Sequence, residues 1–260
     1  MASFSKTHRL FRLSSAVSLT ALSLGFAGSV QAALVYSELF PNADSTDDEV
    51  STASWISYSG ATATLFTGTG NNKIYIPGGF GNGNPQTRGF LALNALPNGN
   101  YVTYESGLNI DPSAGALTVS WQYHASVAGN AETRLLLQVG GQWVATTQTF
   151  TAVSTGTLAT FGDIVNAGAY TRSFNFDPTA SSWLDVTLTP GTPGSQLSIS
   201  GTARTTNLPS GPITAIGFHY VASGTVSTRI DTLQIDQVPE PHLTTLLLAG
   251  GLGLVARRKR

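Results

Sequence analysis

The sequence predicts an all-β protein built as a two-sheet antiparallel sandwich, or jelly roll, with an immunoglobulin-like sandwich as the alternative. Short runs of alternating apolar and polar residues recur between Ala33 and Gln237, as strands with one buried face require. Gly, Pro, Asn and Ser separate these runs, and no stretch between them keeps a helical spacing of apolar residues. The spacing of runs and turns predicts about twelve strands.

The expected strands are the runs in which the alternation is clearest. In chain order they are residues 34–39, 117–124, 134–139, 183–189, 196–201, 213–221 and 229–236. Residues 77–85 and 190–195 are rich in turn formers and predict loops. In the last run, Ile230, Leu233 and Ile235 are the apolar residues among polar neighbours. Their spacing predicts a bulge near Thr232. We expect the first and last runs to pair, which closes the sandwich and places both of its ends on one side.

The composition is that of an exported β protein rather than a cytosolic one. Charged residues make up 10% of the 260-residue chain, and there is no cysteine, which excludes disulfides and Cys-ligated metals. Between Ala33 and Val238 there are six cationic and thirteen acidic residues, a net charge of −7. Such a segment repels phosphate backbones, so we expect no nucleic-acid partner.

Residues 1–32 have the order of a secretory signal peptide. A basic segment with Lys6, Arg9 and Arg12 precedes an apolar segment from Leu13 to about Phe26. Val30-Gln31-Ala32 then forms a small-residue cleavage pattern. We therefore expect cleavage between Ala32 and Ala33. The implied partners are the Sec translocon and signal peptidase.

The last 23 residues have the features of a second targeting signal. Pro239-Glu240-Pro241 breaks regular structure, an almost uncharged run follows from Leu243 to Ala256, and Arg257, Arg258, Lys259 and Arg260 end the chain. The fourteen apolar residues would form a helix of roughly 21 Å, shorter than a hydrocarbon core of about 30 Å. These features predict a short transmembrane helix held by a basic tail.

This arrangement resembles the PEP-CTERM sorting signal, and the resemblance covers residues 238–260. It implies recognition by an exosortase in the inner membrane of a Gram-negative bacterium that makes exopolysaccharide. The expected organisation is therefore a signal helix (1–32), an all-β sandwich domain (33–237) and a sorting signal (238–260). The resemblance also implies transient anchoring in the inner membrane, followed by release to the outer surface or extracellular matrix.

The middle segment resembles, more loosely, the concanavalin-like or laminin-G-like jelly roll. The resemblance lies in an early strand, a central run LTVSWQYHAS and a closing run IDTLQID. The laminarinase-like members of that fold use Glu-x-Asp-x-x-Glu on one strand, and this motif is absent from the sequence. We therefore predict no catalytic residues and no enzymatic activity.

One acidic cluster is a candidate calcium site. Asp44, Asp47, Asp48 and Glu49 offer the oxygen ligands that Ca²⁺ prefers, although their spacing is not that of an EF-hand loop. The alternative is a solvated acidic loop. No other cofactor is expected. His124 and His219 lie near the ends of apolar strands, where a buried, structural histidine is the expected outcome.

Aromatic side chains supply the candidates for sugar binding, because exposed rings can stack on the apolar faces of sugars. Seven were considered, namely Trp55, Tyr58, Tyr75, Trp121, Tyr123, Trp143 and Trp183. We expect Trp121 and Trp183 to be core residues. Trp143, just after Gly140-Gly141, is the preferred candidate, with Tyr75 as the second.

Taken together, these patterns predict an exported, non-enzymatic cell-surface or matrix protein that is sorted by exosortase. The alternative is a carbohydrate-binding module for the cell's own exopolysaccharide. A glycoside hydrolase ranks third, because it would need two carboxylates facing one another across a cleft.

Overall fold

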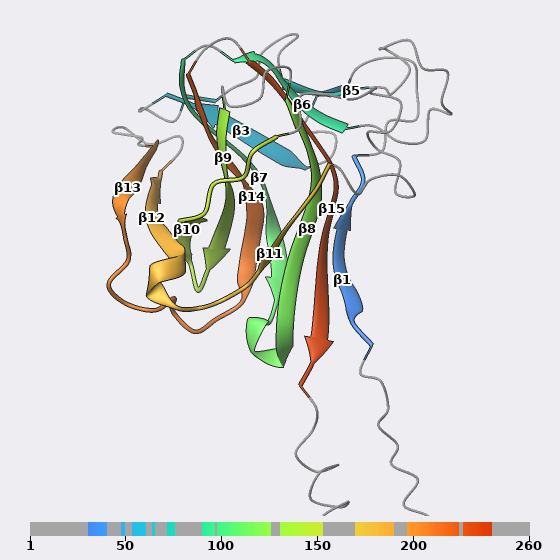
Figure 1. Ribbon diagram of the computed structural model, residues 1–260, viewed down its shortest axis with the longest axis vertical. Helices are drawn as coiled ribbons and strands as arrows, with labels where there is room; N and C mark the ends of the chain where they lie inside the picture. Colours follow the sequence, from blue (N-terminus) through green and yellow to red (C-terminus); the bar gives the residue numbers. More distant parts are fainter. Residues whose placement is uncertain are drawn as a thin grey trace, which may run out of the picture.

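The chain folds into two antiparallel β-sheets packed face to face (Figure 1). This is a computed structural model, and it describes residues 31–40, 48–49, 54–60, 64–65, 72–75, 90–96, 98–125, 131–152, 170–189, 197–223 and 226–240. Two single turns of 3₁₀-helix, Pro112–Ala114 and Ala180–Ser182, are the helical elements of these residues. The predicted all-β antiparallel sandwich is confirmed.

The smaller sheet has seven strands. They are β1 (Ala33–Glu38), β2 (Asp48–Glu49), β5 (Asn72–Tyr75), β6 (Phe90–Leu96), β8 (Gly115–Ala125), β11 (Thr171–Asn175) and β15 (Val226–Pro239). Their order is β11-β8-β15-β6-β5-β2, and β1 pairs with β15 beside this path.

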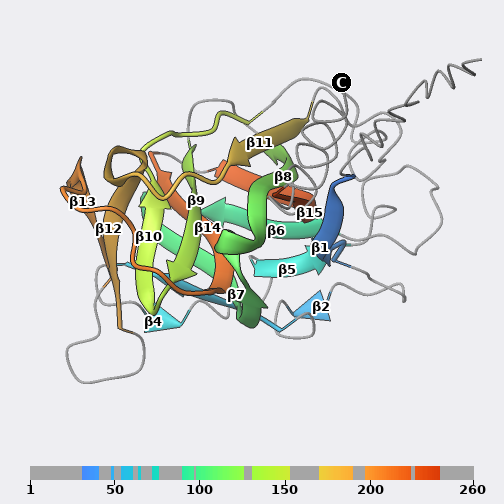
Figure 2. The ribbon, with the colours of Figure 1, turned by 90° about the horizontal axis from the view of Figure 1, so that it is seen from below.

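The larger sheet has eight strands. They are β3 (Trp55–Ser59), β4 (Thr64–Leu65), β7 (Gly99–Ile110), β9 (Ala131–Val139), β10 (Gln142–Thr146), β12 (Trp183–Leu188), β13 (Leu197–Ala203) and β14 (Ile213–Ala222). Their order is β13-β12-β10-β9-β14-β7-β3-β4. Figure 2 shows β13, β12, β10, β9 and β14 side by side in this order.

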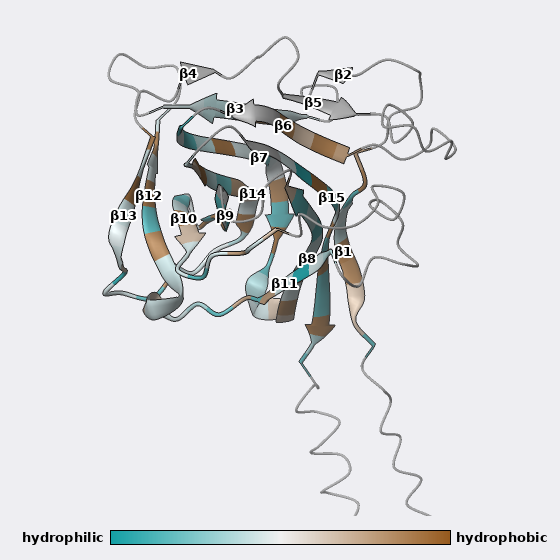
Figure 3. Ribbon diagram, turned by 45° about the horizontal axis from the view of Figure 1, so that its top comes forward, coloured by the Kyte–Doolittle hydropathy of each residue, from teal (hydrophilic) through white to brown (hydrophobic). Residues whose placement is uncertain are grey.

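The alternation that predicts the strands also sets their two faces. In β12 the burial pattern switches between buried and exposed from Leu184 onward, and hydrophobic and hydrophilic colours alternate along such strands in Figure 3. Each of the six later runs coincides with a strand, β8, β9, β12, β13, β14 or β15. The described residues form fifteen strands rather than about twelve. Pieces as short as β2 and β4 contain too few residues to show an alternation.

The main core lies between the sheets and is rich in aromatic rings. Trp55, Trp121 and Trp183 are at most 1% exposed, and Tyr123 and Phe218 are fully buried. Trp121 and Trp183 are thus core residues, as predicted. The Tyr123 hydroxyl shares a hydrogen bond with the Thr133 hydroxyl, which joins β8 of one sheet to β9 of the other.

The first and last strands of the domain pair with each other, as predicted. Ala33 lies opposite Gln237 and Glu38 opposite Leu233 in an antiparallel ladder. The predicted bulge is also present, because the register of β15 against β8 shifts between Asp231 and Gln234, where Thr232 has a φ of 52°. The start of β1 and the end of β15 therefore lie at one end of the sandwich.

The hairpin between β9 and β10 turns on two glycines. Gln142 pairs with Val139, so Gly140 and Gly141 form a two-residue loop, and their φ angles are 53° and 80°. Two consecutive positive φ angles define a type I′ turn, whose twist matches that of the flanking strands. This turn sets the register of β10 and thereby the face on which Trp143 lies.

Both predicted targeting segments fall largely outside the described residues. This applies to the signal segment before Gln31 and to the apolar run from Leu243 to Ala256. Within the part of the chain that the structure describes, no helix has the length and apolarity to cross a membrane. Ala32 and Ala33, which flank the predicted cleavage point, are exposed, and β1 begins at Ala33.

Candidate binding face

The outer face of the eight-stranded sheet is apolar instead of uniformly polar. A second hydrophobic cluster lies there, separate from the core between the sheets. Its buried members are Val102, Tyr104, Leu136, Ala145, Val186, Leu188, Leu197 and Ala215, and Ile56, Tyr58, Trp143 and Ile199 pack against it partly exposed. The partly exposed side chains beside this buried cluster make the face a candidate for binding.

Three aromatic rings from different strands meet on this face. The ring centroids of Tyr104 and Trp143 are 4.7 Å apart in an edge-to-face arrangement, and those of Tyr58 and Tyr104 are 6.3 Å apart and stacked. Burial, with a smaller contribution from the hydrogen bond to Tyr58, raises the pKa of Tyr104 to about 12, so its hydroxyl stays protonated. We call Tyr58, Tyr104 and Trp143 the aromatic platform.

Small residues underlie the platform and let its rings approach each other. Strands β9 and β14 separate Trp143 on β10 from Tyr104 on β7, so the two side chains must lean toward one another across them. The residues that face outward there include Ala145, Ala215 and Gly217. A Cβ on Gly217 would lie 2.5 Å from the Tyr104 Cβ, so only glycine fits this position.

A pocket of about 390 Å³ opens on the same sheet, at the side of β12 and β13. This volume is within the range of about 300–1,000 Å³ that small-molecule sites occupy. Its lining combines polar groups with apolar ones. The lining residues are Glu132, Arg134, Thr147, Leu184, Ile199, Ser200, Gly201, Ala203, His219 and Val221.

Arg134 is held in place on one side of the pocket. Its Nη1 donates hydrogen bonds to the carbonyl oxygens of Thr146, at 2.9 Å, and Thr147. Its Nη2 lies 3.9 Å from Glu132 Oε2, too far for a hydrogen bond, and the Arg134 side chain is 17% exposed. The guanidinium therefore keeps donor capacity on the side of the pocket.

His219 lies beside Arg134 in the β14–β9 ladder and is 1% exposed. Neither its Nδ1 nor its Nε2 has a hydrogen-bond partner. Burial, reinforced by the positive charge of Arg134, lowers the pKa of His219 to about 4, so the ring is neutral at physiological pH. A neutral imidazole has one donor and one acceptor nitrogen, and here both are unused.

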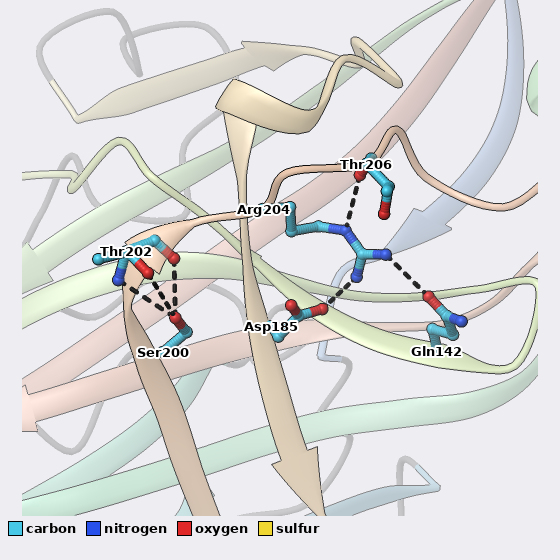
Figure 4. A network of polar contacts seen from close by, with 6 residues as sticks. All are labelled: Gln142, Asp185, Ser200, Thr202, Arg204 and Thr206. Atoms are coloured by element: carbon cyan, nitrogen blue, oxygen red, sulfur yellow. Dashed lines mark hydrogen bonds and ion pairs between the residues drawn. The ribbon is translucent and has the colours of Figure 1, made fainter.

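The edge strand β13 forms one wall of the pocket, and a bulge shapes it. Val186 pairs with Ile199 and Leu184 with Ala203, so β13 has extra residues between these two pairs. The Ser200 hydroxyl donates to the Thr202 carbonyl at 2.8 Å and accepts from the Thr202 amide at 3.1 Å, which stabilises the bulge (Figure 4).

Arg204 fastens the end of this wall to the strands beside it. Its guanidinium forms an ion pair with Asp185 on β12 and donates to Gln142 Oε1 on β10 at 3.0 Å (Figure 4). Its Nε donates to the Thr206 carbonyl at 3.2 Å. The Arg204 side chain is 8% exposed although that of Asp185 is 64% exposed, so the guanidinium is packed and geometrically fixed.

The structure sorts the predicted aromatic candidates into two groups. Trp143 lies on the binding face, with Tyr58 beside it, whereas Trp55 and Tyr123 are buried in the core between the sheets. Tyr75 lies on β5 of the other sheet, and its side chain is outside the described residues. The predicted pair Trp143 and Tyr75 is therefore on different sheets.

The other predicted site residues lie mostly outside the described part of the chain. Asp44 and Asp47 are not described, and Asp48 and Glu49 form β2 with their side chains undescribed. Among the described residues, no three His, Cys, Asp or Glu side chains gather closely enough to hold a metal ion. Of the sorting motif, Pro239 and Glu240 are described and exposed, while Pro241 and the four cations from Arg257 to Arg260 are not described.

The residue that sequence reasoning missed is His219. The sequence shows it as one more residue in an apolar strand, and the expected outcome was a structurally satisfied histidine. His124 does contact Arg229, with 3.3 Å between its Nδ1 and the arginine Nη1. For His219 the only available signal was its outward phase in β14, the phase opposite to that of Phe218 and Tyr220.

Comparison with known proteins identifies no family for this chain. No protein-family model and no curated protein matches the chain. One similar solved structure is the family 11 carbohydrate-binding module of the cellulosomal cellulase Lic26A-Cel5E of Clostridium thermocellum. The two sequences are 16% identical, the match covers 81% of this chain and 99% of that chain, and the TM-score is 0.39. The solution structure of CtCBM11 gives 17% identity, 82% and 99% coverage and a TM-score of 0.42.

An α-L-arabinofuranosidase crystallised with arabinose also matches, with 9% identity and a TM-score of 0.38, over 76% of this chain and 25% of that one. Identities and scores of this size support no conclusion about this chain. What this chain binds has to be argued from its own residues.

Proposed function

We propose that this protein is an exported, non-catalytic glycan-binding domain, and that its outer face on the eight-stranded sheet binds polysaccharide. One observation carries the proposal: the aromatic platform lies on the same face as a pocket with donors and acceptors in its wall. This is the carbohydrate-binding alternative of the sequence analysis, and it now ranks above a purely structural matrix protein.

The chemistry of the face suits a sugar polymer. A pyranose ring has C–H groups that pack on aromatic rings, and hydroxyls around its rim that need hydrogen-bond partners. The partly exposed Trp143 and Tyr58 offer ring surface, and Arg134 and Glu132 offer donors and acceptors. Both kinds of contact come from paired strands, so the face is preorganised for binding.

The arrangement of carboxylates supports binding without hydrolysis. Glycoside hydrolysis generally uses two carboxyl groups on opposite sides of the scissile bond. Among the described residues that line the pocket, Glu132 is the one carboxylate, and its side chain is 63% exposed. Glu38 and Glu105 also approach each other, but neither lines the pocket. Glu105 Oε2 accepts a hydrogen bond from the Tyr36 hydroxyl at 2.5 Å.

The proposed route of the protein agrees with this arrangement. The basic segment and the small-residue cleavage pattern before Ala33 support export, and the motif from Pro239 to Arg260 supports sorting by an exosortase. The tail follows β15 of the smaller sheet, whereas the binding face belongs to the other sheet. An anchored chain would therefore leave the binding face available to exopolysaccharide.

The test is retention by polysaccharides. The exported chain, purified in mild detergent, is run through native gels that contain a panel of neutral and acidic polysaccharides. We expect Trp143→Ala to weaken retention about tenfold or more, because aromatic anchors of binding sites commonly contribute about 1–2 kcal/mol or more.

The matched control is Leu34→Ala, which truncates a large side chain that is 54% exposed and lies on β1, away from the face. Its retention should equal that of the unmodified chain. Equal retention of the Trp143→Ala variant, with an unchanged melting temperature, would contradict the proposal and favour the purely structural role. Release of reducing sugar would contradict its non-catalytic part.

A further inference from the structure

The pocket beside the aromatic platform contains a buried group that no protein atom satisfies. Both ring nitrogens of His219 are buried and without partners, and the ring lines the pocket together with Val221 from the same outward face of β14. An unsatisfied buried polar atom costs about 1–3 kcal/mol, so a binding partner for these nitrogens would offset a real cost. The pocket is where such a partner can enter.

The two unused nitrogens specify what that partner must offer. A neutral imidazole needs an acceptor for its N–H and a donor for its other nitrogen. A carboxylate or phosphate offers acceptors alone, and an ammonium group offers donors alone. A hydroxyl both donates and accepts, so a compound with several hydroxyls can satisfy both sides of the His219 ring.

The charges around the pocket point the same way. Arg134 and Glu132 lie on β9 beside His219, and their opposite charges, 3.9 Å apart, give the pair no net charge. On the β7 side, the neighbour of His219 is the uncharged Val102. The segment between the two targeting signals carries a net charge of −7, which disfavours polyanions at long range.

The rest of the lining is apolar and has the character that a sugar ring requires. Leu184, Ile199, Ala203 and Val221 supply hydrocarbon surface beside the polar groups. Ile199 also packs against the cluster that contains the aromatic platform, whereas none of the three platform rings lines the pocket. The pocket and the platform are thus neighbouring but separate places on one face.

We propose that this pocket is a second subsite that binds one uncharged sugar unit, whose hydroxyls are hydrogen-bonded by His219, Arg134 and Glu132. The inference rests on the proposed glycan-binding function and adds the ligand class and the residues that select it. The carboxylate of a sugar acid adds no favourable contact with the neutral imidazole, and the Arg134–Glu132 pair has no net charge to attract it.

The test uses small sugars, which can occupy a single subsite. Isothermal titration of the full chain in mild detergent compares D-glucose, D-galactose and D-mannose with D-glucuronate, all at millimolar concentrations. We expect at least one neutral sugar to bind, and glucuronate to bind no more tightly than glucose. His219→Phe keeps a ring of similar size without its nitrogens, and it should weaken neutral-sugar binding about tenfold or more.

A second pair of variants is independent of any change in the buried strand. Gly201 is exposed and lines the pocket, and a Cβ added there would meet no atom within 4 Å. Gly201→Tyr should therefore fold normally, fill the pocket and abolish small-sugar binding. Ser198→Tyr, at an exposed position of the same strand outside the pocket lining, is the matched control and should bind like the unmodified chain.

The outcomes separate this inference from the proposed function. Small-sugar binding that is lost in His219→Phe and Gly201→Tyr but kept in Trp143→Ala supports the second subsite. The inference is overturned if no tested sugar binds, if glucuronate binds tenfold more tightly than glucose, or if both pocket variants bind normally. Polysaccharide retention that still depends on Trp143 would, in each of these cases, leave the proposed function standing.

Discussion

His219 links the stability of the fold to its binding chemistry. The His219 ring is buried and lies beside the positive charge of Arg134. Both facts disfavour protonation, so the ring is neutral in the folded state. His124 behaves similarly in the other sheet, where burial and Arg229 lower its pKa to about 4. Two histidines that resist protonation make the folded state sensitive to acid.

The sign of this effect follows from proton binding. In the unfolded chain His219 takes up a proton below its ordinary pKa of about 6.5, whereas in the folded chain it does so only below about 4. Between these values the unfolded state binds more protons, so the free energy of unfolding decreases as the pH falls. Full loss of this contribution corresponds to about 3 kcal/mol.

We therefore predict that urea denaturation will show stability falling from about pH 6.5 to about pH 4, and that His219→Phe will flatten part of this slope. Glu132 and Arg134 lie beside His219 on β9 in both proteins, so the two proteins differ only at residue 219. His124, whose pKa is also lowered to about 4, should contribute to the slope that remains in the variant. An identical slope in both proteins would show that His219 titrates normally in the folded state.

At the scale of elements, the β9–β10 hairpin decides where Trp143 lies. Gly140 and Gly141 both adopt positive φ angles, but their surroundings differ. A Cβ on Gly140 would lie 2.9 Å from Pro209 Cγ and 3.0 Å from the Ser210 carbonyl oxygen, whereas a Cβ on Gly141 would meet nothing within 4 Å. Both positions therefore favour glycine because of their positive φ angles, and Gly140 also lacks room for a Cβ.

This difference gives a matched pair of variants. Gly141→Ala should lower the free energy of unfolding by about 1–2 kcal/mol, the usual cost of a left-handed conformation for a residue with a Cβ. Gly140→Ala should cost more, because the neighbouring segment must also shift. Chemical denaturation measures both values, and equal losses would show that the contacts with Pro209 and Ser210 are unimportant.

At the scale of the whole molecule, the two ends of the domain are part of one ladder. Ala33, where the mature chain is predicted to begin, lies opposite Gln237, and Pro239 ends the same long strand. The last strand pairs with β8 along one edge and with β6 and β1 along the other. This strand is therefore part of the core of the smaller sheet, and the proposed sorting tail follows it directly.

We predict that replacing Pro239, Glu240 and Pro241 by alanine leaves unprocessed precursor in the inner membrane. Proline disfavours helix, and alanine at both proline positions would favour a helix that continues from the apolar run into the motif. Fractionation and immunoblotting of exported protein measure the result. Leu34→Ala with Val35→Ala, at exposed positions on β1, is the control. Normal processing and location of the triple variant would refute exosortase sorting.

How far the sequence predicts this protein can be seen at particular residues. The alternation around Trp121 and Trp183 predicts strands with those rings inside, and both rings are buried. The phase change near Thr232 predicts a bulge, and one is there. Trp143, the preferred candidate for sugar binding, lies partly exposed beside the second hydrophobic cluster, and its binding role stays a prediction. The sequence does not show Tyr104 beside it, because β14 and β9 separate their strands in the sheet.

The sequence by itself determined the all-β class, the positions of seven of the fifteen described strands and the pairing of the first strand with the last. These follow from local alternation and turn chemistry, which act over a few residues. The tertiary structure alone decided that Tyr58, Tyr104 and Trp143 meet, and that His219 lines a pocket without a partner. Period-two alternation gives each strand two faces. Which residues share a face across strands depends on pairings between residues as far apart in the chain as Arg134 and His219.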